Sequence, residues 1–172
     1  LLASAICSCS EKQPAATNEP MITKTEIQVE NGKLTPEIMH RLGKVGDPQL
    51  SPNYGKILYG VSYTSIEQNK GNRELFLMNA DGTENVKLTN TPKSESNARW
   101  MNDSQIIYMR GGKLYTATIE GSTLKNEKEV TGAEGMESFE LSPAGDKIMF
   151  IKSIKAAQNP TDVYADLDKS SG

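Results

Sequence analysis

The chain has 172 residues, with 19 Lys and Arg against 22 Asp and Glu and a net charge of −3. This slightly acidic balance gives no electrostatic footprint for nucleic acid or for an anionic membrane surface, so no nucleic-acid partner is expected. The two cysteines, Cys7 and Cys9, are too close for an unstrained disulfide. With no other cysteine present, thiol catalysis and a thiolate metal site are excluded.

Residues 1–25 have the pattern of a signal peptide remnant followed by a polar tether. The small-x-small sequence Ala3-Ser4-Ala5 fits ordinary signal cleavage. The sequence Ile6-Cys7-Ser8-Cys9 instead resembles a bacterial lipobox in which Cys9 carries lipid, and Cys7 fits that role less well because bulky Ile6 precedes it. Both alternatives predict export across the bacterial inner membrane. They differ in whether the product is periplasmic or an outer-membrane lipoprotein attached to the membrane through Cys9.

Residues 26–46 are expected to form a lead-in with one short strand and one short helix. Thr25–Val29 is predicted to be the strand, and Asn31-Gly32 the turn that follows it. Thr35 suits the N-cap of a helix, Pro36 its first position and Gly43 its end.

A phrase of about ten residues occurs three times and carries most of the information on the fold. LSPNYGKILY begins at Leu50, LSPAGDKIMF begins at Leu141, and RWMNDSQIIYM from Arg99 keeps the layout with one residue missing. Repeats about 40 to 50 residues apart, made of short strands and polar turns, are typical of β-propeller blades. Residues 47–172 are therefore predicted to be all-β, forming a partial β-propeller of about three four-stranded antiparallel blades.

The blades are expected over residues 47–89, over residues 96–131 and from residue 136 onward. Three strand segments are apolar on both faces and so need cover on both sides, which neighbouring blades can supply. These segments are Glu74–Met78, Ile106–Met109 and Ile148–Ile151.

The sequence also predicts the connections between the strands. Asp81-Gly82 and Gly111-Gly112 predict hairpin turns, because both dipeptides adopt positive φ at low cost. Thr64–Asn72 is polar and is expected to be a longer rim loop. Three blades do not close a ring, and an open arc leaves strand edges and apolar faces in water. Further blades are therefore expected beyond residue 172.

No segment matches a catalytic motif. Gly60-Val61-Ser62-Tyr63-Thr64 lacks the second glycine of a nucleophile elbow, and no phosphate-binding loop is present. His40, the single histidine, is expected on the polar side of the small helix as a surface residue and not as a base or ligand. No catalytic, cofactor-binding or metal-binding residue is expected in this chain, and no cofactor.

Three further features are candidates for a functional or core role. Asn79–Thr83 has a faint likeness to a calcium loop but lacks the repeated oxygen ligands and the closing glutamate, so a β-turn is expected. Glu134, Glu137 and Glu140 form an acidic cluster that could hold a substrate amine, although a solvated face is the simpler interpretation. Trp100 takes the apolar position of the repeat and is expected in the core.

Ser51–Tyr59, followed by Glu74–Thr83 and Lys87–Thr89, resembles the WD40-like repeat of TolB-type propellers. Leu34–Glu37 together with Leu42–Pro52 resembles the start of the propeller in serine peptidases of the prolyl oligopeptidase family. The likeness is greatest to secreted bacterial dipeptidyl-peptidase and acylaminoacyl-peptidase-like members.

This resemblance covers about residues 33–155 and implies a longer protein. In that family an α/β-hydrolase domain with the catalytic Ser, Asp and His follows the propeller, so this domain is expected beyond residue 172. The propeller would act as a lid and size filter that admits short peptides as substrates of the full-length protein. The alternative is a non-enzymatic TolB-like envelope propeller that binds a protein or glycan partner. A propeller lyase or glycosidase is a third possibility, which the single histidine disfavours.

Overall fold

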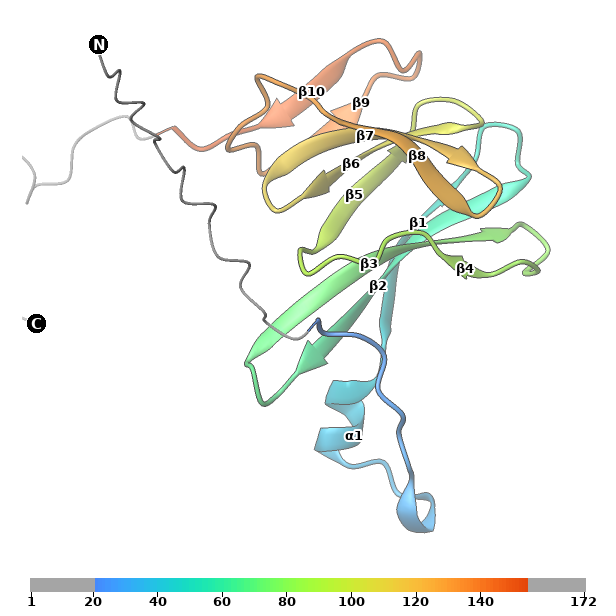
Figure 1. The fold of residues 1–172 in the computed structure, drawn as a ribbon, viewed down its shortest axis with the longest axis vertical. Helices are drawn as coiled ribbons and strands as arrows, with labels where there is room; N and C mark the ends of the chain where they lie inside the picture. The colour runs from blue at the N-terminus through green and yellow to red at the C-terminus, as the bar shows by residue number, and fades with distance from the viewer. Residues whose placement is uncertain (1–20, 155–172) are drawn as a thin grey trace, which may run out of the picture.

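The computed structural model describes residues 21–154, which form three antiparallel sheets with very little helix (Figure 1). The first sheet contains β1 (Lys44–Leu50), β2 (Lys56–Ser65), β3 (Lys70–Asn79) and β4 (Val86–Lys87). The second contains β5 (Glu95–Trp100), β6 (Gln105–Arg110), β7 (Lys113–Glu120) and β8 (Thr123–Glu129). The third contains β9 (Ser138–Leu141) and β10 (Ile148–Ile151).

In all three sheets, every strand pairs with its neighbour in the chain. The spatial orders are β1-β2-β3-β4, β5-β6-β7-β8 and β10-β9. The predicted all-β class is therefore confirmed. Of the three predicted four-stranded sheets, two are complete among the described residues and the third has two strands there.

A serine organises the turn before the second strand in two copies of the repeat. The Ser51 hydroxyl accepts the backbone N–H of Lys56 at 2.9 Å and donates to a side-chain oxygen of the same turn. Ser142 accepts the backbone N–H of Lys147 at 3.1 Å and likewise donates within its own turn. Such side-chain bonds to the local backbone favour tight turns.

The first strands of the two complete sheets each contain a bulge at the same place in the repeat. The register of β1 against β2 shifts after Gly46, and the register of β5 against β6 shifts after Ser96. One residue in each bulge has positive φ, 54° at Asp47 and 51° at Asn97. Asp and Asn tolerate this region better than most residues, and a bulge redirects the side chains that follow it. The repeat thus extends upstream of the shared turn.

Two apolar clusters cover the two faces of the second sheet. On β6, Ile106 and Tyr108 are both 0% exposed and pack with Leu58 and Leu75 of the first sheet. The alternate β6 residues, Ile107 and Met109, pack in a second cluster with Phe139 of β9. Figure 1 shows the second sheet between the first sheet and β9–β10. The prediction that Ile106–Met109 is covered on both faces is therefore confirmed.

Trp100 is partly buried and packs against the first of these clusters, as expected of a core position. Its indole N–H also donates to the backbone carbonyl of Gln49 at 3.0 Å. This bond joins the ends of β5 and β1, so the side chain ties the first two sheets together as well as filling space.

The strand β10 differs from its counterparts β2 and β6. The exposed fractions of its side chains are 38% at Ile148, 68% at Met149, 52% at Phe150 and 58% at Ile151. The strand was predicted correctly, but the expected cover on both faces is not found within the described residues. β10 pairs with β9 along one edge only, whereas β2 and β6 each have a strand on both sides.

The lead-in contains the predicted helix but not the predicted strand. Helix α1 (Pro36–Arg41) begins after Thr35, whose hydroxyl accepts the backbone N–H of Ile38 at 3.4 Å. Thr25–Val29 does not form a strand, and a short 3-10 helix, η1 (Glu30–Gly32), follows it. A strand needs a hydrogen-bonded neighbour, and no described strand pairs with this segment. That prediction was therefore wrong.

The predicted rim loop at Thr64–Asn72 was also wrong. Strands β2 and β3 continue through most of it, pairing Thr64 with Gly71 and Ser65 with Lys70. Only residues 66–69 turn, with Asn69 at a φ of 47°. Backbone hydrogen bonding thus extends the two strands into polar residues that side-chain hydrophobicity alone would assign to a loop.

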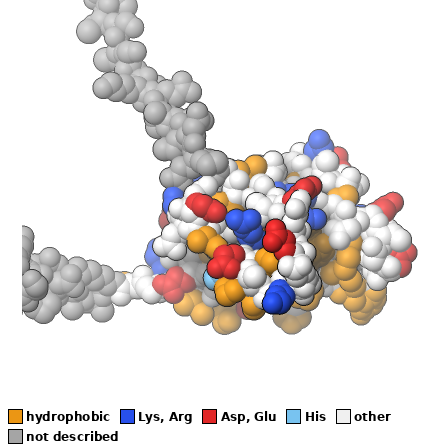
Figure 2. Space-filling model, turned by 90° about the horizontal axis from the view of Figure 1, so that it is seen from below, with side chains coloured by type: hydrophobic (Ala, Val, Ile, Leu, Met, Phe, Trp, Pro, Cys, Tyr) orange, Lys and Arg blue, Asp and Glu red, His pale blue; other side chains and the backbone are white. Residues whose placement is uncertain are grey.

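The end of the molecule that carries α1 has a mixed surface. Figure 2 shows Lys, Arg, Asp and Glu side chains interspersed there with hydrophobic ones. The exposed hydrophobic residues of this part include Leu34, Met39 and Leu42. Between residues 21 and 154, no helix has the length and apolar character needed to cross a membrane.

Candidate functional site

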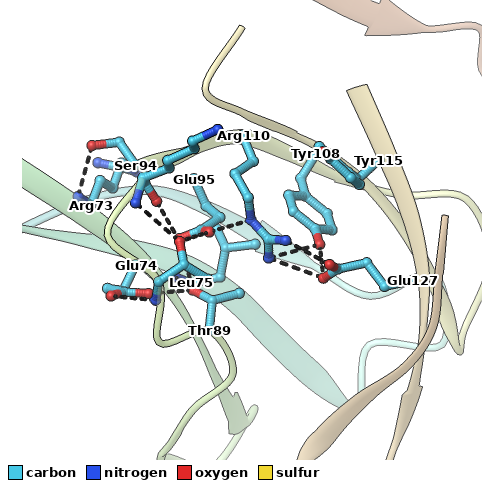
Figure 3. Close-up of polar contacts among 12 residues, drawn as sticks. Arg73, Glu74, Leu75, Thr89, Ser94, Glu95, Tyr108, Arg110, Tyr115 and Glu127 are labelled. Carbon is cyan, nitrogen blue, oxygen red and sulfur yellow. Dashed lines mark hydrogen bonds and ion pairs between the residues drawn. The ribbon is translucent and has the colours of Figure 1, made fainter. Parts of the chain in front are cut away.

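Polar side chains gather where the first sheet meets the second, and we call this group the junction cluster (Figure 3). Glu74 comes from β3, Thr89 from the segment after β4, Glu95 from β5, Arg110 from β6 and Glu127 from β8. Glu74 and Glu95 are each 0% exposed, and Thr89 is 4% exposed. Five segments thus bring three carboxyl groups and a guanidinium to the boundary of two apolar sheets.

Arg110 is the centre of the junction cluster. Its Nε donates to Glu95 Oε1 at 2.6 Å, while its two terminal nitrogens donate to the Glu127 carboxylate at 2.5 Å and 3.0 Å. The guanidinium carbon also lies 5.4 Å from the ring centre of Tyr108 and 5.2 Å from that of Tyr115. Cation–π contacts of this kind add to the ion pairs and hold the guanidinium in place.

Burial and pairing act on the ionisation of these groups in different directions. Burial raises the pKa of Glu95, against hydrogen bonds from Thr91 and Arg110 that lower it. Burial also opposes ionisation of Glu127, but hydrogen bonds from Arg110 and Tyr108 outweigh it and lower the pKa of Glu127. Burial and the hydrogen bond to Glu127 raise the pKa of Tyr108, so this phenol stays neutral. The pKa values of the two carboxyl groups that contact Arg110 are thus shifted in opposite directions.

A groove of about 360 Å³ opens beside the junction cluster. Its lining includes Lys87, Thr89, Thr91, Arg110, Ser122 and Glu127. Among the described residues, every buried side-chain nitrogen and oxygen has a hydrogen-bond partner. The network is therefore internally satisfied, and it holds the sheets together without leaving a group aimed at a ligand.

A second polar group, the three-sheet ion cluster, consists of Asp47, Arg99 and Glu140. Arg99 donates to both oxygens of Asp47 at 3.1 Å and 3.0 Å and to Glu140 at 3.3 Å and 3.1 Å. These residues lie on β1, β5 and β9, the first strands of the three sheets. Burial opposes the charge of Arg99, but the bonds to Glu140 and Asp47 raise its pKa. One guanidinium therefore joins three sheets that are far apart in the sequence.

The structure disperses the acidic cluster suggested by the sequence. Glu140 pairs with Arg99, while exposed Glu134 accepts the backbone N–H of Gly132 at 3.0 Å within its own turn. Glu137 is exposed, and its backbone N–H donates to the Ile151 carbonyl. The carboxylates of Glu134 and Glu140 thus have different partners, and all three side chains are exposed, as the solvated-face interpretation predicted.

The other sequence candidates fall outside any assembled site. His40 is exposed in the last turn of α1. At Asn79–Thr83, Asp81 Oδ1 accepts from the backbone and the hydroxyl of Thr83 at 2.9 Å and 2.6 Å, which is the predicted turn. Within residues 21–154, no three His, Cys, Asp or Glu side chains gather as metal ligands would. Cys9, the predicted lipid attachment site, lies outside the described residues.

Sequence reasoning missed both polar groups. The available signal was a charged residue at the margin of an apolar strand, such as Glu74 before Leu75–Met78 and Arg110 after Ile106–Met109. A charged residue that enters a core boundary requires a partner. The partners Glu95 and Glu127 could not be named before the strand register was known.

Two curated proteins match most of the chain. It is 34% identical over 142 residues to the dipeptidyl-peptidase 5 of Porphyromonas gingivalis, covering 81% of this chain and 21% of that protein. It is 29% identical over 153 residues to the dipeptidyl-peptidase 5 of Porphyromonas endodontalis, covering 86% of this chain and 22% of that protein. The chain therefore spans about a fifth of the length of the curated relatives it matches. No family model matches it.

Among solved structures, the chain resembles the acylaminoacyl peptidase of Pyrococcus horikoshii. The TM-score is 0.52 at 16% sequence identity, over 65% of this chain and 17% of that one. At this identity the likeness concerns the fold alone. The chain is thus similar in sequence to about a fifth of two peptidases and in fold to part of a third, which supports a relationship to peptidases.

Proposed function

We propose that residues 47–154 are the first blades of a β-propeller in a longer serine peptidase of the prolyl oligopeptidase family. The sequence similarity to two dipeptidyl-peptidases 5, across four fifths or more of this chain, carries the proposal. The repeated order of four consecutive antiparallel strands in the first two sheets supports it, because that is the construction of propeller blades.

The exposed strand β10 also supports further blades. It follows the same turn as β2, yet its side chains from Ile148 to Ile151 are 38% to 68% exposed. Another strand beside β10, and another blade against it, would bury these side chains as the second sheet buries those of β2. Each buried apolar side chain of this size stabilises a fold by roughly 1.5–3 kcal/mol.

In this proposal the propeller is the lid and size filter of the enzyme. The catalytic Ser, Asp and His lie in an α/β-hydrolase domain outside residues 1–172, and short peptides are the substrates. The satisfied junction cluster and the exposed position of His40 fit a segment that restricts access without taking part in bond cleavage. Neither a cofactor nor nucleic acid has a role.

Release of dipeptides by the full-length protein tests this function. The protein is incubated with an eight-residue peptide, with the same peptide acetylated at its amino terminus, and with a folded protein of similar composition. Dipeptides released from the free peptide alone support a dipeptidyl-peptidase, and release of an acetylated residue supports an acylaminoacyl-peptidase activity. Failure to cleave any of them, together with tight binding of a protein or glycan, would establish the envelope-propeller alternative.

We further propose that the protein is exported and carries lipid at Cys9. Intact mass measurement of the mature amino terminus distinguishes lipid on Cys9 from cleavage after Ala5. In a Cys9→Ser variant, lipidation predicts that the protein moves from the detergent phase to the aqueous phase. An unchanged partition would refute lipid attachment without affecting the proposed activity.

A further inference from the structure

Two buried carboxyl groups, those of Glu74 and Glu95, meet at a single hydroxyl group. Thr89 Oγ1 lies 2.7 Å from Glu74 Oε2 and 3.0 Å from Glu95 Oε2, and it accepts the backbone N–H of Leu75 at 2.9 Å. A hydroxyl has one hydrogen to donate. If both carboxyl groups were ionised, one of the two contacts would bring two oxygen atoms together without a hydrogen between them. A proton on one carboxyl group completes both bonds.

The charge count around this pair gives the same result. Three carboxyl groups face two cations, so full ionisation leaves a net charge of −1 at a largely buried boundary. The charged or titratable groups that surround the pair are Glu74 (β3), Lys87 (β4), Glu95 (β5), Tyr108 and Arg110 (β6) and Glu127 (β8). Burying an uncompensated charge is costly. One proton makes the cluster neutral.

The contacts of the two carboxyl groups indicate which one holds the proton. Glu74 Oε1 accepts two N–H groups, from the Asn72 side chain at 3.1 Å and the Thr91 backbone at 3.2 Å, and forms an ion pair with Lys87 at 3.3 Å. Several N–H donors stabilise the charged form of a carboxylate. Glu95 Oε1 accepts from Arg110 at 2.6 Å and from the Thr91 hydroxyl at 2.7 Å, but Arg110 is shared, because its terminal nitrogens donate to the Glu127 carboxylate. The ionised form of Glu95 is therefore less stabilised than that of Glu74.

We propose that Glu95 is protonated and donates a hydrogen bond to Thr89 through this proton, and that loss of the proton as the pH rises weakens the contact between the first two sheets. This device does not depend on the proposed peptidase activity. Burial raises the pKa of Glu95, which agrees with the geometry. A carboxyl group whose pKa is raised by folding stabilises the folded state most below its unfolded pKa. That contribution is lost as the pH rises through the pKa of the folded protein.

A carboxyl titration of the whole chain tests the location of the proton. The chain is labelled with ¹³C at the glutamate carboxyl carbons, and the Glu95 signal is the one that disappears in Glu95→Gln. Its expected midpoint lies above the value of about 4.3 for an unperturbed glutamate. A midpoint at or below that value would overturn the proposal.

A matched pair of substitutions, Glu95→Gln and Glu127→Gln, tests the consequence for stability. Both replace a carboxyl group that contacts Arg110 with an amide of the same size. The amide at position 95 can donate to Thr89 and still accept from Arg110, as the protonated acid does. We expect Glu95→Gln to keep or raise the melting temperature at pH 8 and to flatten its fall with pH. Glu127→Gln should lower the melting temperature at pH 8, because the Glu127 carboxylate is ionised. Equal losses in both variants would refute the assignment.

Discussion

Leu58 tests whether the first two sheets are held together by their shared apolar cluster. Leu58 is 0% exposed and lies in the same cluster as Ile106 and Tyr108 of the second sheet. Leu58→Ala removes buried methyl groups and leaves a cavity, which costs about 2–5 kcal/mol in well-packed cores. At roughly 2–4 °C per kcal/mol for a domain of this size, a loss of ~3 kcal/mol lowers the melting temperature by about 6–12 °C.

The assay has two readouts. Thermal unfolding followed by circular dichroism gives the loss of stability, and amide hydrogen exchange shows where the fold opens. Because the cluster spans two sheets, exchange should accelerate in β6 as well as in β2. Leu50→Ala is the matched control, since Leu50 is 49% exposed and should lose less than about 1 kcal/mol. Equal losses for the two variants, or faster exchange in β2 alone, would refute the packing between the sheets.

Three further perturbations address the ion pairs, a turn and the exposed strand. Arg99→Met removes two partly exposed ion pairs and should cost about 1–2 kcal/mol in urea unfolding, with the loss reduced at high salt; a loss that is independent of salt would contradict an electrostatic role. Gly112→Ala places a side chain at a φ of 77° in open space and should cost about 1–2 kcal/mol through the backbone alone, so an unchanged urea midpoint would refute the assigned turn. The exposed apolar strand β10 is expected to make the 172-residue chain self-associate, and Phe150→Lys should reduce this association in sedimentation velocity; a monomeric unmodified chain, or unchanged association in the variant, would show that β10 is not a contact.

Local patterns in the sequence were sufficient for much of the fold. Two features depend only on neighbouring residues and on one repeated unit, so the sequence was sufficient to predict them. They are the polar turns that begin at Ser51 and Ser142, and the run Ile106–Met109, which is apolar on both faces. Thr25–Val29 and Thr64–Asn72 were misread because strand formation depends on a hydrogen-bonded partner. The first segment has none among the described strands, and the second has one despite its polar residues.

The polar groups that join the sheets could not be predicted. Arg99 and Asp47 are 52 positions apart, and their contact depends on two bulges and on the packing of separate sheets. Glu95 and Arg110 are register partners on β5 and β6, a relation that appears only once the strands are aligned. Their charges looked like an ordinary solvated surface in the sequence, and burial alone distinguishes them.

The central claim, that this chain belongs to a longer serine peptidase, is tested most directly by covalent labelling of the full-length protein. The protein is treated with a fluorophosphonate probe, digested, and the labelled serine is located by mass spectrometry. The 172-residue chain treated in the same way is the control. Our account predicts one labelled serine outside residues 1–172, loss of dipeptide release on labelling, and no label on the control. A full-length protein that takes up no probe, or a label on a serine within residues 21–154, would contradict it.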